Sequence, residues 1–242
     1  MTIRIAMWSG PRNISTAMMR AWENRSDCAV IDEPFYACYL NETGADHPCR
    51  EAVLTSQPTR RETVIEELTL SEPAPIFYQK HMTHHMPAGC DLSWAAGMRH
   101  VFLIRDPAAV IASYLNKMPT VSAEDIGIVR QWELFKTISD LTGTRPPVID
   151  STDVLNAPEA VLQRLCAALD VPWTEGEMTA WPPGPRLSDG VWARHWYQSV
   201  WASTGFVAPR AAAEHGSGPA QSLARAMLPY YEALSVNRLE SD

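Results

Sequence analysis

Short apolar runs alternate along the chain with longer segments in which apolar residues recur at helical spacing. An apolar run of about 4–8 residues bounded by turn residues is typical of a buried strand. Five such runs predict strands at Ile3–Trp8, Ala29–Asp32, Ile76–Gln79, His100–Arg105 and Pro147–Asp150. Strands that alternate with helices form a parallel sheet covered on both faces. The pattern therefore predicts an α/β fold with three layers.

Periodic segments and capping residues place the helices. Asp106-Pro107 is typical of a helix start, because Asp caps free N–H groups and Pro fits the first turn. Ser122 begins a capping-box-like pattern, Ser-Ala-Glu-Asp, ahead of a long helix. The predicted helices span residues 14–24, 60–70, 106–117, 122–141, 156–169, 192–203 and 221–234. Residues 40–60 predict a loop with fragments of helix, and the Pro- and Gly-rich residues 172–190 predict an irregular connection.

The order of these elements indicates one domain over residues 1–242, with a core over 1–172 and a helical C-terminal addition over 173–242. Hydrophobic residues make up 46% of the chain and charged residues 20%, which excludes disordered and fibrous classes. No apolar run approaches the ~20 residues of a membrane span, and residues 1–25 show no secretory signal. We therefore expect a soluble, cytoplasmic protein with no membrane partner.

Charge and cysteine usage narrow the possible partners further. A net charge of −8 argues against general nucleic-acid binding, although it remains compatible with a local anion site. The five cysteines include no Cys-x-x-Cys pair, and we interpret them as reduced thiols rather than as a disulfide framework. Nothing in the sequence indicates the oligomeric state.

Polar residues directly follow the first four predicted strands. Open α/β sheets bind ligands at the carboxyl ends of their strands, so these residues are the candidates for a site. The segments are Ser9–Thr16, Asp32–Phe35, Gln79–His85 and Arg105–Pro107. The first combines a turn, a basic residue and a hydroxyl pair before a predicted helix, whose first N–H groups attract phosphate. It lacks the Gly and Lys of a nucleotide-triphosphatase loop, and a tight turn with an ordinary helix cap is the alternative interpretation.

This first segment resembles the first-strand loop of sulfotransferases that use 3'-phosphoadenylyl sulfate (PAPS). That loop has the form Pro-(Lys/Arg)-Ser-Gly-(Thr/Ser)-(Thr/Ser), and Pro11-Arg-Asn-Ile-Ser-Thr16 is similar to it. A second family signature, Arg after a central strand and Ser eight positions later, is similar to Arg105 and Ser113. A third similarity runs from Pro147 to Val171, so the resemblance covers about residues 3–172 in order.

The resemblance implies a P-loop nucleotide-kinase or sulfotransferase type of fold, PAPS as the donor, 3'-phosphoadenosine 5'-phosphate (PAP) as the product, and no required metal. The first loop would hold the 5'-phosphosulfate, and Arg105 with Ser113 would hold the 3'-phosphate. The loop residues implied are Gly10, Pro11, Arg12, Asn13, Ile14, Ser15 and Thr16.

Two departures from the family pattern concern the nucleotide. Ile14 replaces the loop glycine, which gives the backbone less freedom near the phosphates. No Arg-Lys-Gly-x-x-Gly element lies near the C-terminus. Arg194, or the turn at Ser203–Phe206, is the candidate substitute for that element.

Sulfuryl transfer needs positive charge at the leaving nucleotide and a base for the acceptor proton. Arg12 and Lys80 are the candidates for that charge. Glu33 is our first candidate for the base, because similar Glu-Pro segments in carbohydrate-type sulfotransferases supply a catalytic carboxylate. Its alternative interpretation is a carboxylate that forms an ion pair with Arg12 or Lys80.

His84 is the second candidate for the base, because an imidazole with a pKa of about 6.5 suits proton transfer near neutrality. Cytosolic members of the family carry Lys-Thr-His after the third strand, but Met82 stands where that His would be. His81 or His84 would then serve, and His81 points into the sheet instead if the strand continues. His81, His84 and His85 have no obvious further ligand, so they do not indicate a zinc site.

Four tryptophans gather in the C-terminal part, at Trp181, Trp192, Trp196 and Trp201. They predict either helix packing against the sheet or an aromatic wall for adenine or acceptor. Three functions stay open: a sulfotransferase acting on the hydroxyl or amine of a small acceptor, a kinase dependent on ATP and Mg²⁺, and a nucleotide-binding protein that has lost catalysis.

Overall fold

The computed structural model describes residues 2–208 and 218–239. Its centre is a five-stranded sheet in the order β2-β3-β1-β4-β5, in which every neighbouring pair is parallel. The strands are β1 (Ile3–Ser9), β2 (Cys28–Asp32), β3 (Ile76–Met82), β4 (Arg99–Ile104) and β5 (Val148–Asp150). The predicted α/β fold with a parallel sheet is confirmed.

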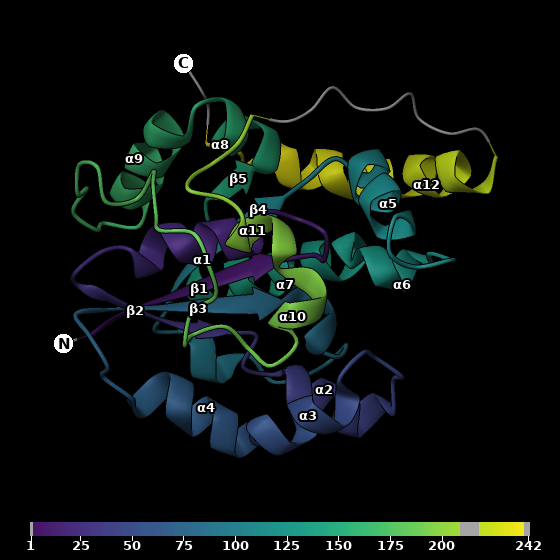
Figure 1. Ribbon diagram of the computed structural model, residues 1–242, viewed down its shortest axis with the longest axis horizontal. Coiled ribbons are helices and arrows are strands. Elements are labelled where there is room, and N and C mark those ends of the chain that lie inside the picture. The colour runs from purple at the N-terminus through teal and green to yellow at the C-terminus, as the bar shows by residue number, and fades with distance from the viewer. Residues whose placement is uncertain (1, 209–217, 240–242) are drawn as a thin grey trace.

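Helices cover both faces of this sheet (Figure 1). In the first half of the chain they are α1 (Ser15–Glu23), α2 (Tyr36–Thr43), α3 (Arg50–Ser56), α4 (Arg61–Leu70) and the 3-10 turns η1 (Thr83–His85) and η2 (Ser93–Ala95). The second half holds α5 (Pro107–Leu115), α6 (Ala123–Ile126), α7 (Ile128–Thr142), α8 (Ser151–Asn156), α9 (Pro158–Ala168), α10 (Ala193–Trp196), α11 (Gln198–Trp201) and α12 (Pro219–Ser235). Within the described residues, no helix combines the length and apolar character needed to cross a membrane.

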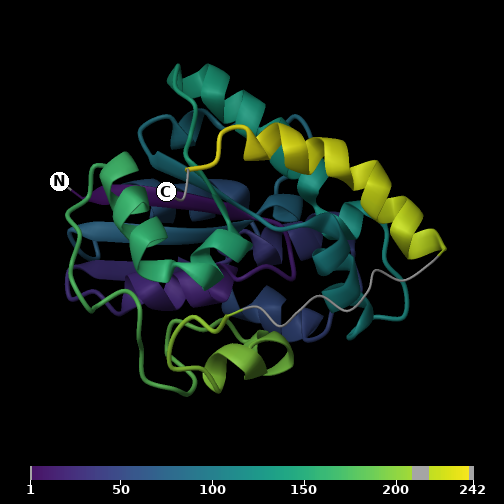
Figure 2. The same ribbon diagram turned by 90° about the horizontal axis from the view of Figure 1, so that it is seen from above.

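Side chains along β1 alternate between two apolar layers, as a pleated strand requires. Ile5 and Met7 join the layer that α1 and α9 complete, whereas Ala6 and Trp8 join the layer that α4, α7 and α12 complete. Figure 2 shows α12, in yellow, lying across α5 and α7 at one side of the molecule. The sheet is therefore buried on both faces, and side chains are available to a ligand only where strands end.

The segment that follows α12 pairs with β5 at one edge of the sheet. The backbone of Val148 accepts a hydrogen bond from Leu239 at 2.8 Å and donates one to Asn237 at 3.3 Å. Val148 is the first residue of the short strand β5, and its register through Phe102 places it level with Trp8 near the carboxyl end of β1.

Several predicted boundaries differ from the structure. β3 continues to Met82, so Lys80 and His81 belong to the strand. Residues 40–60, predicted as loop with helical fragments, hold the end of α2 and all of α3. The predicted helix 192–203 is two short helices, α10 and α11, and α8 was not predicted. Part of the loop predicted before the last helix, residues 209–217, lies outside the described residues.

The helix predicted over 122–141 is interrupted at Gly127, which has φ of +71° and separates α6 from α7. Added Cβ atoms show why the chain bends here: one on Gly127 would lie 3.0 Å from Thr83 Oγ1, and one on Gly10 would lie 2.7 Å from the carbonyl oxygen of Ile126. The junction packs directly on the β1–α1 loop, and two residues without side chains permit that approach.

Residues 180–205, which we call the flap, leave the sheet and return to their starting point. Ala180 and Gly205 form an antiparallel bridge, and the Trp181 N–H donates to the Thr204 carbonyl at 3.0 Å. Asp189 anchors the flap through an ion pair with the buried Arg20 of α1. The flap thereby brings α10 and α11 to the carboxyl ends of the strands.

Candidate active site

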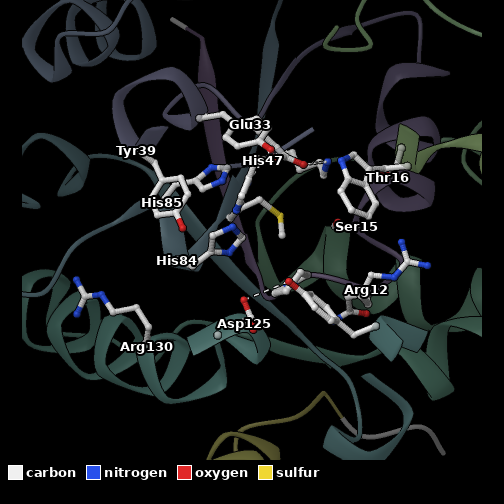
Figure 3. A pocket seen from close by; sticks show the side chains of 18 of the residues that line it. Arg12, Ser15, Thr16, Glu33, Tyr39, His47, His84, His85, Asp125 and Arg130 are labelled. Atoms are coloured by element: carbon white, nitrogen blue, oxygen red, sulfur yellow. Dashed lines mark hydrogen bonds and ion pairs between the residues drawn. The ribbon is translucent and has the colours of Figure 1, made fainter. Parts of the chain in front are cut away.

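A pocket of about 890 Å³ lies at the carboxyl ends of β1, β2, β3 and β4 (Figure 3). Each of these strands, or the loop directly after it, supplies a charged side chain to the wall of the pocket. These are Arg12 after β1, Glu33 after β2, Lys80 in β3 and Arg105 after β4. The η1 turn adds His84, and the flap covers part of the opening with Trp196 and other residues. The pocket unites segments that are as much as 180 residues apart, since a parallel sheet places its strand ends along one edge.

The β1–α1 loop is fixed by its own asparagine. Asn13 Oδ1 accepts the N–H of Ile14 at 2.8 Å, and its Nδ2 donates to the carbonyl of Leu103 in β4 at 3.1 Å. Ile14 has φ of −87°, whereas Arg12 has φ of +54°. The replacement of the family glycine by Ile14 therefore costs no backbone strain, because the left-handed residue of this loop is Arg12.

The start of α1 faces the pocket with its first turn uncapped. No side chain caps this helix, and its first two residues, Ser15 and Thr16, line the pocket. Free N–H groups at a helix start, together with two hydroxyls, form a site suited to an anion. Gly10 itself is buried beneath the loop and does not line the pocket.

Two arginines stand side by side next to this helix start. Arg105 Nη1 donates to the carbonyl of Arg12 at 2.5 Å, and Arg12 Nε donates to Ser113 Oγ at 3.1 Å. Burial lowers the pKa of both guanidinium groups, and for Arg105 the charge of Arg12 adds to that effect. Neither forms an ion pair within residues 2–208 and 218–239. Two partly buried cations without a carboxylate favour a multiply charged anion.

Lys80 lies at the centre of a buried polar cluster. Its Nζ donates to Asp32 at 2.7 Å, to Glu33 at 2.8 Å and to the hydroxyl of Tyr197 at 2.6 Å. Tyr197 in turn donates to Asp32 at 2.8 Å and accepts from Trp192 Nε1 at 3.1 Å. Burial alone would lower the pKa of Lys80, but the two carboxylates hold it well above its ordinary value. Lys80 is thus a fully partnered cation.

Glu33 has both the position and the environment of a proton acceptor. Burial raises the pKa of its carboxyl group, while Lys80 opposes that shift. Its backbone has φ of +44°, and its N–H donates to the carbonyl of Lys80 at 2.9 Å. Backbone strain of this kind costs of order 1–3 kcal/mol and gathers at functional sites. Glu33 forms an ion pair with Lys80, which was one of the two interpretations from sequence, and its side chain also lines the pocket.

The three clustered histidines separate into different environments. His84 lines the pocket, and burial lowers its pKa to about 4. His85 also lines the pocket and stacks on Tyr36 with ring centroids 4.6 Å apart. His81 faces away, stacks on Trp8 at 4.5 Å and contacts Gln79 at 3.2 Å. Since β3 continues through position 81, His81 points into the sheet, as the strand alternation anticipated.

Some predicted site residues lie elsewhere, and others were not predicted. Arg194 is exposed on α10 and does not line the pocket. Trp181 packs in the core against Phe206, whereas Trp192 and Trp196 line the pocket. Tyr197 was missed, because a tyrosine within the helix predicted over residues 192–203 matches no motif. The described residues contain no group of three or more His, Cys, Asp or Glu placed to hold a metal ion.

Comparison with protein families gives a match to the sulfotransferase domain over residues 3–238. Among curated proteins, the chain is 36% identical over 209 residues to branched-chain-amino-acid aminotransferase-like protein 1 of Arabidopsis thaliana. That match covers 85% of this chain and 37% of the plant protein, so the chain spans little more than a third of that relative. The name of the relative describes the longer protein.

Solved structures share the fold. A sulfotransferase from Alicyclobacillus acidocaldarius superposes with a TM-score of 0.58 at 10% identity and covers 98% of this chain and 95% of its own. A sulfotransferase domain from the Synechococcus PCC 7002 olefin synthase gives 0.51 at 16% identity, with 94% and 95% covered. At these identities the likeness is one of architecture.

Proposed function

Because the chain belongs to the sulfotransferase domain family, we propose that it transfers a sulfuryl group from PAPS to a hydroxyl or amine of a small acceptor. The observation that carries this proposal is the pair Arg12 and Arg105, two cations without a carboxylate partner beside an uncapped helix start. PAPS carries its charge on a phosphosulfate and a 3'-phosphate, so these residues suit it.

The proposed roles follow the family signatures that these residues resemble. Arg12, the α1 start and the hydroxyls of Ser15 and Thr16 bind the phosphosulfate, and Arg105 with Ser113 binds the 3'-phosphate. The guanidinium carbon of Arg12 lies 6.0 Å from the Trp196 ring centre, which keeps this side chain beside the flap. Arg12 supplies positive charge for the leaving phosphate, because Lys80 is already balanced by Asp32 and Glu33.

Sulfuryl transfer also requires a group that accepts the proton of the acceptor. The acceptor oxygen or nitrogen forms a bond to sulfur, the bond between sulfur and the phosphate oxygen breaks, and PAP leaves with the electron pair. Glu33 takes the proton that the acceptor loses. Lys80, Asp32 and Tyr197 hold the Glu33 carboxylate in place, and the raised pKa of Glu33 increases its affinity for that proton.

A nucleotide-binding experiment tests the donor. Thermal unfolding is measured with PAP, with AMP and with ATP plus Mg²⁺. PAP at about 100 times its dissociation constant should stabilise the protein by roughly 2.7 kcal/mol, with a smaller effect from AMP. Arg105→Ala should weaken PAP binding about ten- to hundredfold, since it removes a charge-assisted contact.

Arg60→Ala is the matched control, because Arg60 is exposed at the start of α4 and outside the pocket. Unchanged PAP affinity in Arg105→Ala would remove Arg105 from the site. Stabilisation by ATP and Mg²⁺ without any by PAP would favour the kinase. Binding of PAP without transfer to any acceptor would favour the protein that has lost catalysis.

A further inference from the structure

The pocket has two halves of opposite electrostatic character (Figure 3). One half, around Arg12 and Arg105, carries the unpaired cations. The other half, which we call the aromatic half, is lined by Tyr36, Tyr39, His47, His84, His85 and Asp125. In Figure 3, Tyr39, His84 and His85 lie across the cavity from Arg12, and Asp125 lies between His84 and Arg12. The donor fits the first half, so the acceptor belongs in the second.

Two basic side chains border the aromatic half, Arg130 and Lys80, and both form ion pairs with carboxylates. Arg130 pairs with Glu133 at 2.9 Å and donates to the carbonyls of Met86 at 2.7 Å and Pro87 at 2.8 Å. Lys80 is shared by two carboxylates. Both are cations that already have carboxylate partners, so neither is left unpaired for an anionic acceptor.

Asp125, by contrast, has hydrogen-bond partners but no basic partner among the described residues. It accepts hydrogen bonds from Ser122 and, at 3.1 Å, from the Tyr114 hydroxyl, but it forms no ion pair within the described part of the chain. The adjacent Glu124 lines the pocket, is exposed and has no ion-pair partner there either. Burial and then the charge of Asp125 raise the pKa of Tyr39, so the field of this carboxylate extends across the aromatic half.

The rings of this half are uncharged and pack around Tyr39, with His85 stacked on it and His84 edge-on to it. The Tyr39 ring lies 5.0 Å from His85, 5.4 Å from His84 and 5.6 Å from His47, measured between ring centres. Burial lowers the pKa of all three histidines, so they are neutral at pH 7. His84 and His85 each leave a buried Nδ1 without a hydrogen-bond partner. Such a wall offers ring faces to a ligand, while the unpartnered imidazole nitrogens lie buried within it.

We propose that the acceptor is a small alcohol or amine that carries a cationic ammonium group, bound between the Tyr39 ring and Asp125. The inference rests on the proposed function and deepens it. Electron-rich ring faces next to an uncompensated carboxylate attract ammonium ions, quaternary ones above all. An anionic acceptor would meet Asp125 and Glu124 unfavourably, and a neutral acceptor would leave the field of Asp125 unused.

A pair of nearly isosteric alcohols tests the charge itself. Choline and 3,3-dimethylbutan-1-ol differ at one atom, a quaternary nitrogen in place of a carbon. Titration of the protein with each, without nucleotide, should show choline binding about tenfold more tightly or better. Asp125→Asn should abolish most of that preference, and Tyr39→Leu should reduce it without altering the capping contacts of Asp125. Glu175→Gln, which removes one exposed carboxylate outside the pocket, should leave the preference unchanged.

Equal affinity for the two alcohols, absence of choline binding, or a preference that survives Asp125→Asn each overturns the inference. A transfer assay with PAPS separates this failure from that of the proposed function. Sulfation of the neutral alcohol at least as fast as of choline rejects the cationic acceptor and keeps the sulfotransferase. Choline binding without PAP binding or transfer rejects the sulfotransferase and keeps the cation site.

Discussion

At the scale of single residues, the most informative side chains are those whose partners come from distant parts of the chain. Tyr197 on the flap contacts Asp32, Glu33 and Lys80, which precede it by more than a hundred positions. The sequence predicted the three strand-end residues, because polar groups after buried strands stand out. It did not predict Tyr197, since only the folded flap brings that hydroxyl to the strand ends.

Glu33→Gln tests which group removes the acceptor proton. The amide retains an oxygen for Lys80 but cannot take a proton, so kcat should fall by about 10²–10⁴-fold while PAP affinity stays nearly unchanged. The base works deprotonated, so the wild-type rate should fall as pH drops through the raised pKa of Glu33. Steady-state kinetics and a PAP titration on Glu33→Gln and His84→Asn compare the candidates. Full activity in Glu33→Gln with loss in His84→Asn would assign the base to His84.

At the scale of elements, the strands and the helices that flank them followed from periodicity, whereas the α6–α7 junction did not. A single glycine within a helical pattern is ambiguous from sequence. Gly127 breaks the helix because its left-handed backbone and missing Cβ let the junction rest against Pro11, with 3.4 Å between Pro11 Cδ and an added Cβ. The shape of the β1–α1 loop thus depends on a helix junction more than a hundred residues away along the chain.

Gly127→Ala should destabilise the fold by about 1–2 kcal/mol through its positive φ, and should weaken PAP binding through displacement of the β1–α1 loop. Gly143→Ala is the matched control. Gly143 has φ of +69° at the end of α7, and an added Cβ would contact nothing within 4 Å. Denaturant unfolding should show a loss in both variants, and PAP titration should show one in Gly127→Ala only. Equal PAP affinity in the two variants would mean that the junction does not shape the loop.

At the scale of the whole molecule, buried neutral histidines tie stability to pH. Burial lowers the pKa to about 3 in His81, to about 4 in His84 and to about 4 in His100. Since these values lie below the ordinary 6.5, the unfolded chain binds more protons in acid than the folded one. Their contribution is fully present above pH 6.5 and is lost as pH falls toward the folded values.

Unfolding free energy should therefore fall between pH 6.5 and pH 5, with a slope for each such histidine that rises from about 0.7 to about 1.4 kcal/mol per pH unit. Urea unfolding across this range gives the slope. His81→Phe keeps a ring against Trp8, lies outside the pocket and removes one titrating group, so its slope should be smaller by one such increment. An unchanged slope in this variant would show that folding does not lower the pKa of His81.

The pairing of Asn237 and Leu239 with Val148 has a practical consequence for handling the molecule. It holds the last described residues at the β5 edge of the sheet, whereas β1 begins at the amino ends of the strands and the pocket opens at their carboxyl ends. A surface tether that continues from Thr2 thus starts from the side of the sheet opposite the pocket, whereas one that continues from Leu239 starts from the β5 edge. Protein immobilised on the Thr2 side would present its pocket to solution, which suits surface-based measurement of nucleotide and acceptor binding.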